Sequence, residues 1–359
     1  GAKNTKEYTN LDEGRYTFMV KARNIYGNES QPARFEFTVQ PPWYRSFWAY
    51  LGYILLAFAL VVVIVQWYTR RLKREKERLE QIVQERTREV VAQKEEIESQ
   101  RDEIASKNQD ITDSIEYASK IQNAVLPQDD QKDKIMPEHF VLYRPRDIVS
   151  GDFYWISRKN GQLIVVAADC TGHGVPGAFM SMLGISLLNE IVHRQQVTQA
   201  NQVLNTLRNE VKRTLKQTGK EGEAKDGMDM ALTIIDQKHM KMQYAGAYNP
   251  LYLFRRGELI QYKADRMPIG IYIKEKSTFT NHTIDLQQGD TFYIFSDGLP
   301  DQFGGSEGSK FKTKRLKQLL YRIQDESMAD QKKILHNTID DWRGDYEQLD
   351  DILLIGVRI

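Results

Sequence analysis

Four acidic positions of the sequence stand where an apolar, strand-like segment begins or ends. They are Asp152 in VSGDFYW, Asp169 in VVAADCTGHG, Asp297 in YIFSDGLPD, and the pair Asp350 and Asp351 in EQLDDILLIG. A single aspartate in such a place usually forms a turn or caps a helix. Four that converge at one end of a sheet would repel one another unless cations neutralised them. Carboxylate oxygens without a cluster of Cys and His favour Mg²⁺ or Mn²⁺ over Zn²⁺, so the pattern predicts a divalent-cation site.

The loop that follows Asp169, DCTGHGVPG, offers a second kind of chemistry. Cys170 is the only cysteine of the chain, which excludes an internal disulfide. A thiol nucleophile would need a histidine base and an orienting acid, and His173 lies close by in the sequence. His173 could instead donate a proton to a leaving group, or bond only to its own turn. We expect Cys170 to be packed at a strand end, so the reactive centre is predicted at the aspartate.

The region from about His139 to Ile359 alternates strand-like and helix-like segments. The predicted strands are QLIVVAAD, MALTIID, MKMQYAGA, PLYLFRRGELIQYK, DTFYIFSDG and DILLIGVRI. Two segments with apolar residues at helical spacing, PGAFMSMLGISLLNEIVHR and NQVLNTLRNEVKRTLKQ, are predicted as helices. A hairpin at Arg256-Gly257 favours antiparallel sheets. The pattern predicts an α+β fold with an antiparallel β-sandwich flanked by helices, rather than a doubly wound parallel sheet.

Several motifs of this region occur together in a known order. They are GDFYW, ADCTGHGVPGAFMS, AGAYNPLYL, MPIG, FSDGLPDQFGG and LDDILLIGV. In order and rough spacing they resemble the metal-dependent protein serine/threonine phosphatases (the PPM family), in their bacterial branch of stage-II-sporulation-E-like, sigma-factor-regulating phosphatases. The resemblance extends over about residues 111–359, and it implies a phosphatase domain over 135–359.

The resemblance also implies a ligand set and a substrate class. Two Mn²⁺ or Mg²⁺ ions would be bridged by Asp169, with a further ligand from the backbone carbonyl of Cys170. The other implied metal ligands are Asp152, Asp297 and Asp350, with Asp351 the less favoured member of the last pair. Two such ions lower the pKa of a water molecule and hold phosphoryl oxygens for in-line attack, so no protein nucleophile is required. The implied substrate is phosphoserine or phosphothreonine of a regulatory protein, such as an anti-sigma-factor antagonist.

Two further groups of side chains are candidate additions to this site. Phosphatases of the wider family carry a basic residue near the first acidic motif, for which Arg144 and Arg146 in YRPRDIVSGD are candidates. Arg146 is the residue we assign to phosphate, although surface pairing is the commoner role of such arginines. Asp226 and Asp229 in KDGMDMALTIID are candidates for a third metal ion or for simple turn formation.

The segment from Ser46 to Thr69 contains no charged residue over 24 positions. As a helix it would be about 36 Å long, against a hydrocarbon core of about 30 Å. Tryptophan and tyrosine stand at both ends, as in interfacial aromatic belts. We therefore predict a transmembrane helix over 46–69, rather than a buried core helix.

The two flanks of this segment differ in charge. RRLKREKER follows it, with six basic residues in nine positions, whereas QPPWYR precedes it. The basic flank is expected on the cytoplasmic side. This predicts a single-pass protein of the bacterial cytoplasmic (inner) membrane, with the N-terminal segment outside and the phosphatase domain in the cytoplasm.

Residues 1–42 have the pattern of a short β-hairpin. Tyr16, Phe18 and Val20 alternate with polar or charged positions, the chain turns at NIYGNES, and ARFEFTV follows. The motif GRYTFMVKARNIYG resembles the last strands of the three-tyrosine β-sandwich in sensor regions of two-component regulators. Because the chain opens without an initiator Met or a signal sequence, we expect a fragment of a longer protein.

Residues 70–126 are rich in Glu, Lys, Gln and Arg and almost free of helix breakers. Apolar residues recur every seventh position: Val83, Val90, Ile97, Ile104, Ile111, Ala118 and Val125. The companion position four residues later is polar through most of its length. This pattern predicts a weak parallel coiled-coil homodimer that transmits a signal, and Leu126-Pro127 is expected to end the helix.

The sequence thus predicts a membrane-anchored, signal-regulated protein phosphatase. A phosphatase fold without activity, which only binds a partner, is the alternative; the complete set of acids disfavours it. A nucleotidyl or diguanylate cyclase would need a triphosphate-binding pattern that FGGSEG does not provide. The net charge of +1 gives no reason to expect nucleic acid.

Overall fold

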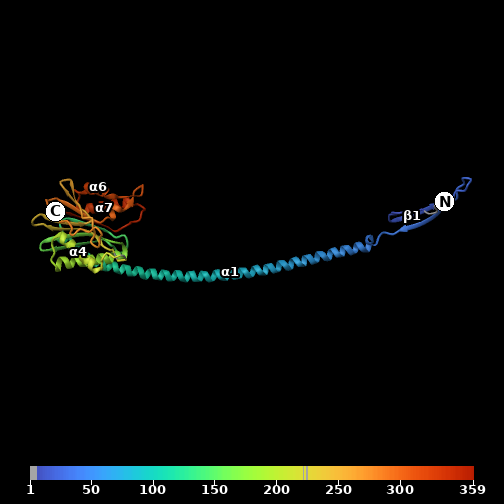
Figure 1. The fold of residues 1–359 in the computed structure, drawn as a ribbon, viewed down its shortest axis with the longest axis horizontal. Coiled ribbons are helices and arrows are strands. Elements are labelled where there is room, and N and C mark those ends of the chain that lie inside the picture. Colours follow the sequence, from blue (N-terminus) through green and yellow to red (C-terminus); the bar gives the residue numbers. More distant parts are fainter. Residues whose placement is uncertain (1–5, 221, 224) are drawn as a thin grey trace. The chain divides into compact units, whose positions relative to one another are not determined.

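The computed structural model describes residues 6–220, 222–223 and 225–359 of the chain (Figure 1). Two compact units divide it, Gly1–Glu103 and Ile104–Ile359. The predicted N-terminal region 1–42 begins with residues 1–5, which lie outside the described residues. Each unit is described by itself.

The first unit begins with an antiparallel hairpin of β1 (Gly14–Val20) and β2 (Ala33–Val39). The register pairs Tyr16 with Phe37 and Phe18 with Phe35. The rings of Tyr16 and Phe37 are stacked, with centroids 5.8 Å apart. The predicted hairpin and its turn are confirmed.

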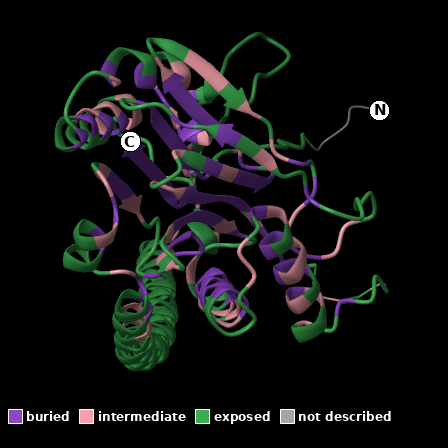
Figure 2. Cartoon of the chain, turned by 90° about the vertical axis from the view of Figure 1, so that its left-hand side faces the viewer, coloured by how far each residue is buried: buried purple, intermediate pink, exposed green. Residues whose placement is uncertain are grey.

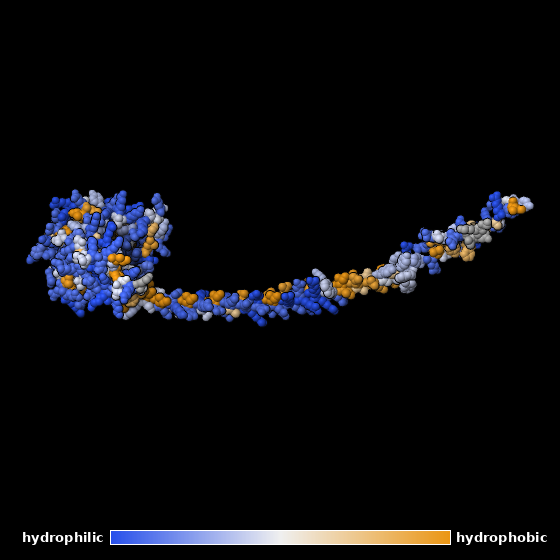
Figure 3. Space-filling view, in the orientation of Figure 1, coloured by the Kyte–Doolittle hydropathy of each residue, from blue (hydrophilic) through white to orange (hydrophobic). Residues whose placement is uncertain are grey.

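A single helix, α1 (Phe47–Val125), follows the short helical turn η1 (Trp43–Arg45) and belongs to both units. Its N-terminal part carries the apolar segment, seen as a continuous orange stretch in Figure 3. Among the described residues, two helices are long and apolar enough to cross a membrane: this one, whose apolar window is 0% buried, and Gly174–Arg194, whose window is 44% buried. The second one packs on a sheet of the C-terminal unit, which identifies it as a core helix of that unit. The helix α1 ends where Leu126-Pro127 was expected to end it.

The second unit contains two five-stranded sheets in which all the paired strands are antiparallel. One sheet has the order β10-β7-β6-β5-β4, and the other has the order β3-β14-β11-β8-β9. The strands of the first sheet are β4 (Phe153–Lys159), β5 (Gln162–Cys170), β6 (Met228–Asp236), β7 (Lys241–Ala247) and β10 (His282–Asp285). Those of the second are β3 (His139–Arg144), β8 (Leu251–Arg255), β9 (Glu258–Tyr262), β11 (Thr291–Phe295) and β14 (Ile352–Arg358). A two-stranded ribbon joins β12 (Phe303–Gly304) to β13 (Ser309–Lys310).

Helices cover the outer faces of the two sheets. The first sheet is covered by α3 (Gly174–Asn189), which continues into a π-helical turn (Glu190–Arg194), and by α4 (Ala200–Thr214). The second is covered by α6 (Lys312–Ile323) and α7 (Met328–Arg343), drawn on the opposite side of the unit from α4 in Figure 1. Two short helices, α2 (Asp129–Ile135) and α5 (Gly298–Asp301), complete the unit.

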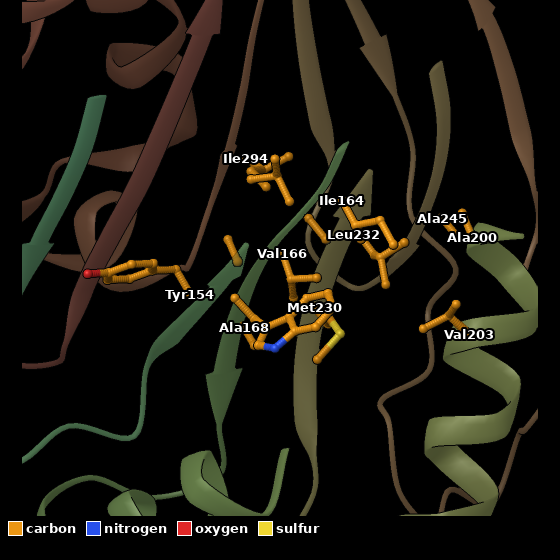
Figure 4. Packing of buried hydrophobic residues seen from close by; sticks show 14 of the residues in the cluster. Tyr154, Ile164, Val166, Ala168, Ala200, Val203, Met230, Leu232, Ala245 and Ile294 are labelled. Atoms are coloured by element: carbon orange, nitrogen blue, oxygen red, sulfur yellow. The ribbon is translucent and has the colours of Figure 1, made fainter. Parts of the chain in front are cut away.

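The core follows from the apolar strands. In β5 the run from Leu163 to Ala168 is 0% exposed, because the strand lies between β4 and β6 in the interior of its sheet, with both faces covered. Figure 4 shows Val166 and Leu232 between Ile294 of the second sheet and α4, where Ala200 and Val203 face the first sheet. Figure 2 shows the strands buried and α1 exposed along its length. The predicted antiparallel α+β sandwich with flanking helices is confirmed. Within the described residues of this unit, the structure adds nine elements to the predicted ones: β3, β4, β10, β12, β13, α2, α5, α6 and α7.

Candidate functional site

The predicted acids gather where strands of both sheets begin or end. Asp152 directly precedes β4 and is 1% exposed. Asp169 is the penultimate residue of β5 and is half-buried. The register of β5 and β6 places Asp169 directly opposite Asp229. Side chains in such a pair have Cβ atoms about 5 Å apart, so the first sheet contributes three neighbouring carboxyl groups.

The second sheet supplies the other acids from its own strand ends. Asp297 follows β11 and immediately precedes α5, whereas Asp350 and Asp351 precede β14. Asp297 lies within hydrogen-bonding reach of Asp169 across the two sheets. The structure therefore brings together carboxylates that are up to two hundred positions apart in the sequence.

The electrostatics of the cluster reflect this crowding. Burial is the largest cause that raises the pKa of Asp152, Asp169, Asp297 and Asp350 above the usual aspartate range. The neighbouring carboxylates add to it, with Asp169 acting on Asp152, and Asp297 and Asp350 acting on Asp169. Burial and the charge of Asp297 raise the pKa of Asp229 to about 7. A cluster of this kind is costly to keep ionised without a compensating positive charge.

The pair Asp350-Asp351 divides into two different environments. Asp351 is 2% exposed, and its two oxygens accept backbone N–H groups of Arg146 and Gly151, each at 2.7 Å. Asp350 is half-buried, and its charge acts on Asp152, Asp169 and Asp297. Asp351 thus holds the loop before Asp152, which leaves Asp350 as the member of the pair that faces the cluster.

One atom of the cluster has the character expected of a metal ligand. Oδ2 of Asp152 is buried and has no hydrogen-bond partner in the part of the chain that the structure describes. Buried carboxylate oxygens are normally hydrogen-bonded or bound to a cation. The hard-oxygen donor set therefore fits Mn²⁺ or Mg²⁺.

The acids do not, however, form a complete coordination site by themselves. Among the described residues, no group of three or more His, Cys, Asp or Glu side chains stands in a geometry that would hold a metal ion. Mg²⁺ commonly keeps several water ligands and uses only one or two carboxylates directly. An ion at this cluster would thus be coordinated partly by water, or the acids would draw together around it.

Glycines permit the close packing of the loops behind Asp152 and Asp169. A Cβ atom on Gly177 would lie 2.3 Å from the carbonyl oxygen of Gly172 and 2.8 Å from Cα of Gly151. A Cβ atom on Gly151 would lie 2.5 Å from the same carbonyl oxygen. Any larger residue at either position would separate the loop before β4 from the loop after β5.

The loop after Asp169 places the other candidate groups in different settings. Cys170 is buried, and burial together with the charge of Asp169 raises the pKa of its thiol, which opposes a nucleophilic thiolate. His173 is exposed, and its Nδ1 lies 2.9 Å from Oδ2 of Asp147. The charge of His173 also acts on Asp350, so the imidazole stands at the rim of the cluster.

The candidate arginines and the two remaining aspartates also differ in whether they lie at the acidic cluster. Nη2 of Arg144 donates to Asp340 on α7 at 2.8 Å, so its guanidinium is paired away from the acids. Nη1 of Arg146 donates to the carbonyl oxygen of Leu349, and its charge acts on Asp350. Asp229 is among the clustered acids, whereas the carbonyl oxygen of Asp226 accepts a hydrogen bond from Gln217.

Sequence reasoning missed Gln122, near the end of α1. Its Nε2 donates to the carbonyl oxygen of Ser150 at 2.6 Å and to Oγ of Ser181 at 2.8 Å, and its Oε1 accepts the N–H of Ser150 at 3.1 Å. Gln122 is thereby hydrogen-bonded to the segment that leads to Asp152. Its place at the second position of the seven-residue repeat, four residues after Ala118, was the available signal. Asp147, the partner of His173, carried no such signal because it is one exposed aspartate in a loop.

Comparison with known protein families identifies two domains in the chain. The profile of the Stage II sporulation protein E (SpoIIE) family matches residues 159–359, and that of the Y_Y_Y domain matches residues 1–40. No curated protein matches the chain.

Solved structures include two informative neighbours. The SiaA-PP2C domain of Pseudomonas aeruginosa is 30% identical, with 71% of this chain and 99% of that domain covered and a TM-score of 0.64. The PP2C phosphatase domain with a regulatory fragment of SpoIIE from Bacillus subtilis is 19% identical over 62% of this chain and 63% of that one, with a TM-score of 0.51, and it supports the fold alone. The chain has a Y_Y_Y domain at its N-terminal end and a PP2C-type phosphatase domain, a type of phosphatase that depends on metal ions. The chain therefore belongs to the SpoIIE family.

Proposed function

We propose that this chain is a membrane-anchored, signal-regulated protein serine/threonine phosphatase. Its substrate would be phosphoserine or phosphothreonine on a regulatory protein, such as an anti-sigma-factor antagonist. The observation that carries the proposal is the buried oxygen of Asp152, which has no partner among the described residues and lies within a group of mutually repelling carboxyl groups. Such a group is costly for the fold and becomes favourable when divalent cations are bound.

The residues of the chain have separate tasks in this proposal. Asp152, Asp169, Asp297 and Asp350, with the backbone carbonyl of Cys170, would hold two Mn²⁺ or Mg²⁺ ions, and Asp229 is the candidate for a third. When bound, the ions would supply charge neutralisation of the phosphoryl group and activation of a water molecule. Asp351 keeps the loop before Asp152 in place through two backbone N–H groups.

Two side chains at the rim can act on the substrate. His173, oriented by Asp147, can hold a proton close to the leaving serine oxygen. Arg146 carries a positive charge near Asp350 and is the candidate for contact with phosphate.

A phosphatase assay on the full chain in detergent micelles tests the activity. We expect release of phosphate from a phosphoserine peptide with Mn²⁺ or Mg²⁺, and none with a chelator. Asp169→Asn should abolish turnover while the thermal unfolding of the domain stays cooperative. Retained turnover in this variant would refute the assignment of Asp169 as the shared ligand.

Two variants separate this mechanism from a thiol mechanism. Cys170→Ala removes the thiol and keeps the backbone carbonyl, so most of the activity should remain. His173→Ala should also retain most of it, because the proposed mechanism does not depend on one proton donor. An inactive Cys170→Ala protein with normal unfolding would favour the nucleophilic cysteine.

The alternative function is an inactive phosphatase fold that relays a signal by binding a partner. Loss of a metal ligand is the change expected in such a protein, and every proposed ligand is present in this chain. Partner binding without metal-dependent phosphate release under any of the conditions above would favour the relay.

The apolar part of α1 supports the membrane location. Over 46–69 it has no charge, and basic residues follow it directly. We propose a single pass through the bacterial cytoplasmic membrane, with the hairpin of β1 and β2 outside. Thiol-specific labelling of a cysteine introduced in the exposed turn at Asn28 should succeed in intact cells with a reagent that does not cross the membrane; protection there would reverse the proposed orientation.

A further inference from the structure

The outer face of α6 is strongly cationic. The helix KTKRLKQLLYRI contains five basic residues and no acid. Its inner face, with Leu316, Leu319 and Leu320, is buried in the core of the second sheet. The basic residues therefore point outward, and they are Lys312, Lys314, Arg315, Lys317 and Arg322.

These five residues differ from two cations of α4, both of which have ionic partners. On α4, Lys212 pairs with Glu275 and Arg213 with Glu210. In the described ranges 6–220, 222–223 and 225–359, none of the five α6 cations forms an ion pair. Ion pairs within the described part of the domain thus do not neutralise the positive charge of this face.

A groove runs along the same face. It has a volume of about 660 Å³ and is lined by residues of α6 together with Leu259, Phe311 and Thr338 of α7. Two of its cations are held against aromatic rings: the guanidinium of Arg315 lies 4.2 Å from the ring centroid of Trp342, and Nζ of Lys317 lies 5.1 Å from that of Tyr252. Nζ of Lys317 also donates to Gln261 at 2.8 Å. The groove therefore presents charges in fixed positions above an apolar floor.

The cationic face begins next to the candidate active site. Lys310, two residues before α6, pairs with Asp301 at 2.7 Å. Asp301 is the last residue of α5, which starts directly after Asp297. The N–H of Phe311 donates to the carbonyl oxygen of Gln302 at 2.8 Å, which ties the start of α6 to the end of α5.

We propose that the outer face of α6 and its groove form a docking surface for an acidic segment of the phosphoprotein substrate. This inference rests on the proposed phosphatase function and names a feature of its substrate. The twelve residues of α6 extend about 18 Å, a length that about six residues of an extended peptide would cover. A groove with aromatic walls suits a polypeptide segment, whereas an anionic membrane surface would need only an exposed flat patch.

Two matched phosphoserine peptides test the docking surface. Both contain the same phosphoserine flanked by uncharged residues. One is extended by six Glu residues and the other by six Gln residues, and each is made in two versions, extended at the N-terminal or at the C-terminal end. With the full chain in detergent micelles and Mn²⁺, we expect at least one Glu peptide to have a KM roughly tenfold lower than its Gln counterpart, at similar kcat. Raising NaCl from about 50 to 500 mM should remove the difference, because exposed charges are screened within a few ångströms at high salt.

The double variant Lys314→Glu with Arg322→Glu should abolish the preference for the Glu peptide and leave kcat for the Gln peptide unchanged. Both residues are exposed, and in the described part of the chain neither side chain forms a hydrogen bond or ion pair. The matched control is Lys238→Glu with Arg256→Glu, which makes the same change of charge in two exposed turns between strands. It should keep the preference.

Binding, measured by fluorescence anisotropy of labelled peptides without phosphate, separates this inference from the activity. If the natural chain binds the Glu peptide more tightly than the Gln peptide and the double variant does not, the docking surface is supported. This holds even if no peptide is hydrolysed, in which case only the proposed activity fails. Equal binding and equal KM for Glu and Gln peptides would overturn the docking surface. A third outcome would also overturn the docking surface, in favour of a membrane contact. In that outcome the natural chain binds phosphatidylglycerol vesicles, the double variant does not, and neither prefers the Glu peptide.

Discussion

Asp350 and Asp351 are neighbours in the sequence, and their surroundings predict opposite consequences of substitution. Asp351→Ala would remove the acceptor of the backbone N–H groups of Arg146 and Gly151, and the buried N–H of Gly151 alone would then cost about 1–3 kcal/mol. The thermal midpoint of the domain should fall by several degrees in calorimetry. Asp350→Asn should leave the midpoint unchanged or raise it, since it removes one of several repelling charges.

The two variants also differ in metal dependence. Asp350→Asn should raise the Mn²⁺ concentration needed for half-maximal activity by about tenfold or more, the effect of losing about 1.4 kcal/mol of binding. A domain in which Asp351→Asn impairs metal binding more than Asp350→Asn does would contradict the assignment of Asp350 as the ligand.

The acidic cluster predicts an unusual pH dependence for the metal-free protein. The pKa of Asp229 is about 7 in the folded chain and that of an ordinary aspartate is 3.8, so the folded state binds the proton more tightly. The stabilisation is therefore fully present below about pH 4 and is lost as the pH rises toward 7. In the presence of a chelator, the thermal midpoint should be higher at pH 5 than at pH 8.

Asp229→Asn is the matched control for this pH effect, because the amide has the same shape and does not titrate. Its midpoint should change less between pH 5 and pH 8 than that of the natural chain. Saturating Mn²⁺ should also reduce the difference, since bound cations favour the ionised carboxylates. A metal-free midpoint that rises with pH over this range would show that the carboxyl groups are not under mutual repulsion.

At the scale of the elements, the sequence predicted strands best where apolar residues were continuous. QLIVVAAD became β5 and DILLIGVRI became β14, because a strand covered on both faces needs apolar residues at every position. Shorter or more polar strands such as β10 (HTID) carried too weak a pattern. The acids of the site were found from their places at strand ends, whereas the roles of Asp351 and Gln122 depend on hydrogen bonds between segments distant in sequence.

The end of α1 supports a further prediction about an element. Gln122→Ala would remove the partners of the buried N–H and carbonyl groups of Ser150, two residues before Asp152. We expect a lower thermal midpoint and weaker activation by Mn²⁺, because the loop that carries Asp152 would lose its fixed position. The measurement is the phosphatase activity as a function of Mn²⁺ concentration.

Asn123→Ala is the control for Gln122, one residue further along the same helix. The side chain of Asn123 is exposed and bonds only to Ser119 on the same helix among the described residues. It should leave both the midpoint and the Mn²⁺ response unchanged. Equal behaviour of the two variants would show that Gln122 does not position the loop.

At the scale of the whole molecule, the repeat along α1 offers a face that a second copy of the chain would cover. Val83, Val90 and Ile97 are 62%, 62% and 64% exposed, and Figure 3 shows orange patches recurring along this part of the helix. Apolar residues at seven-residue spacing are typical of a parallel coiled coil. Since the helix continues to Gln122, such a dimer would connect the proposed membrane segment with the loop of Asp152 along one element.

Cysteine cross-linking in membranes tests this dimer. Single cysteines at Val83, Val90 and Ile97 should form disulfide-linked dimers rapidly under mild oxidation. Cysteines at Glu85 and Ala92, two residues after Val83 and Val90, should react slowly, since they lie on the opposite side of the helix. Cys170 is buried and should give little background, and Cys170→Ala provides a fully cysteine-free starting chain. Efficient cross-linking at every position, or at none, would show that the seven-residue repeat does not define a dimer face. A rate that peaks every seventh residue would show that two copies of α1 meet along this repeat, and that a signal altering their register would act on both phosphatase domains together.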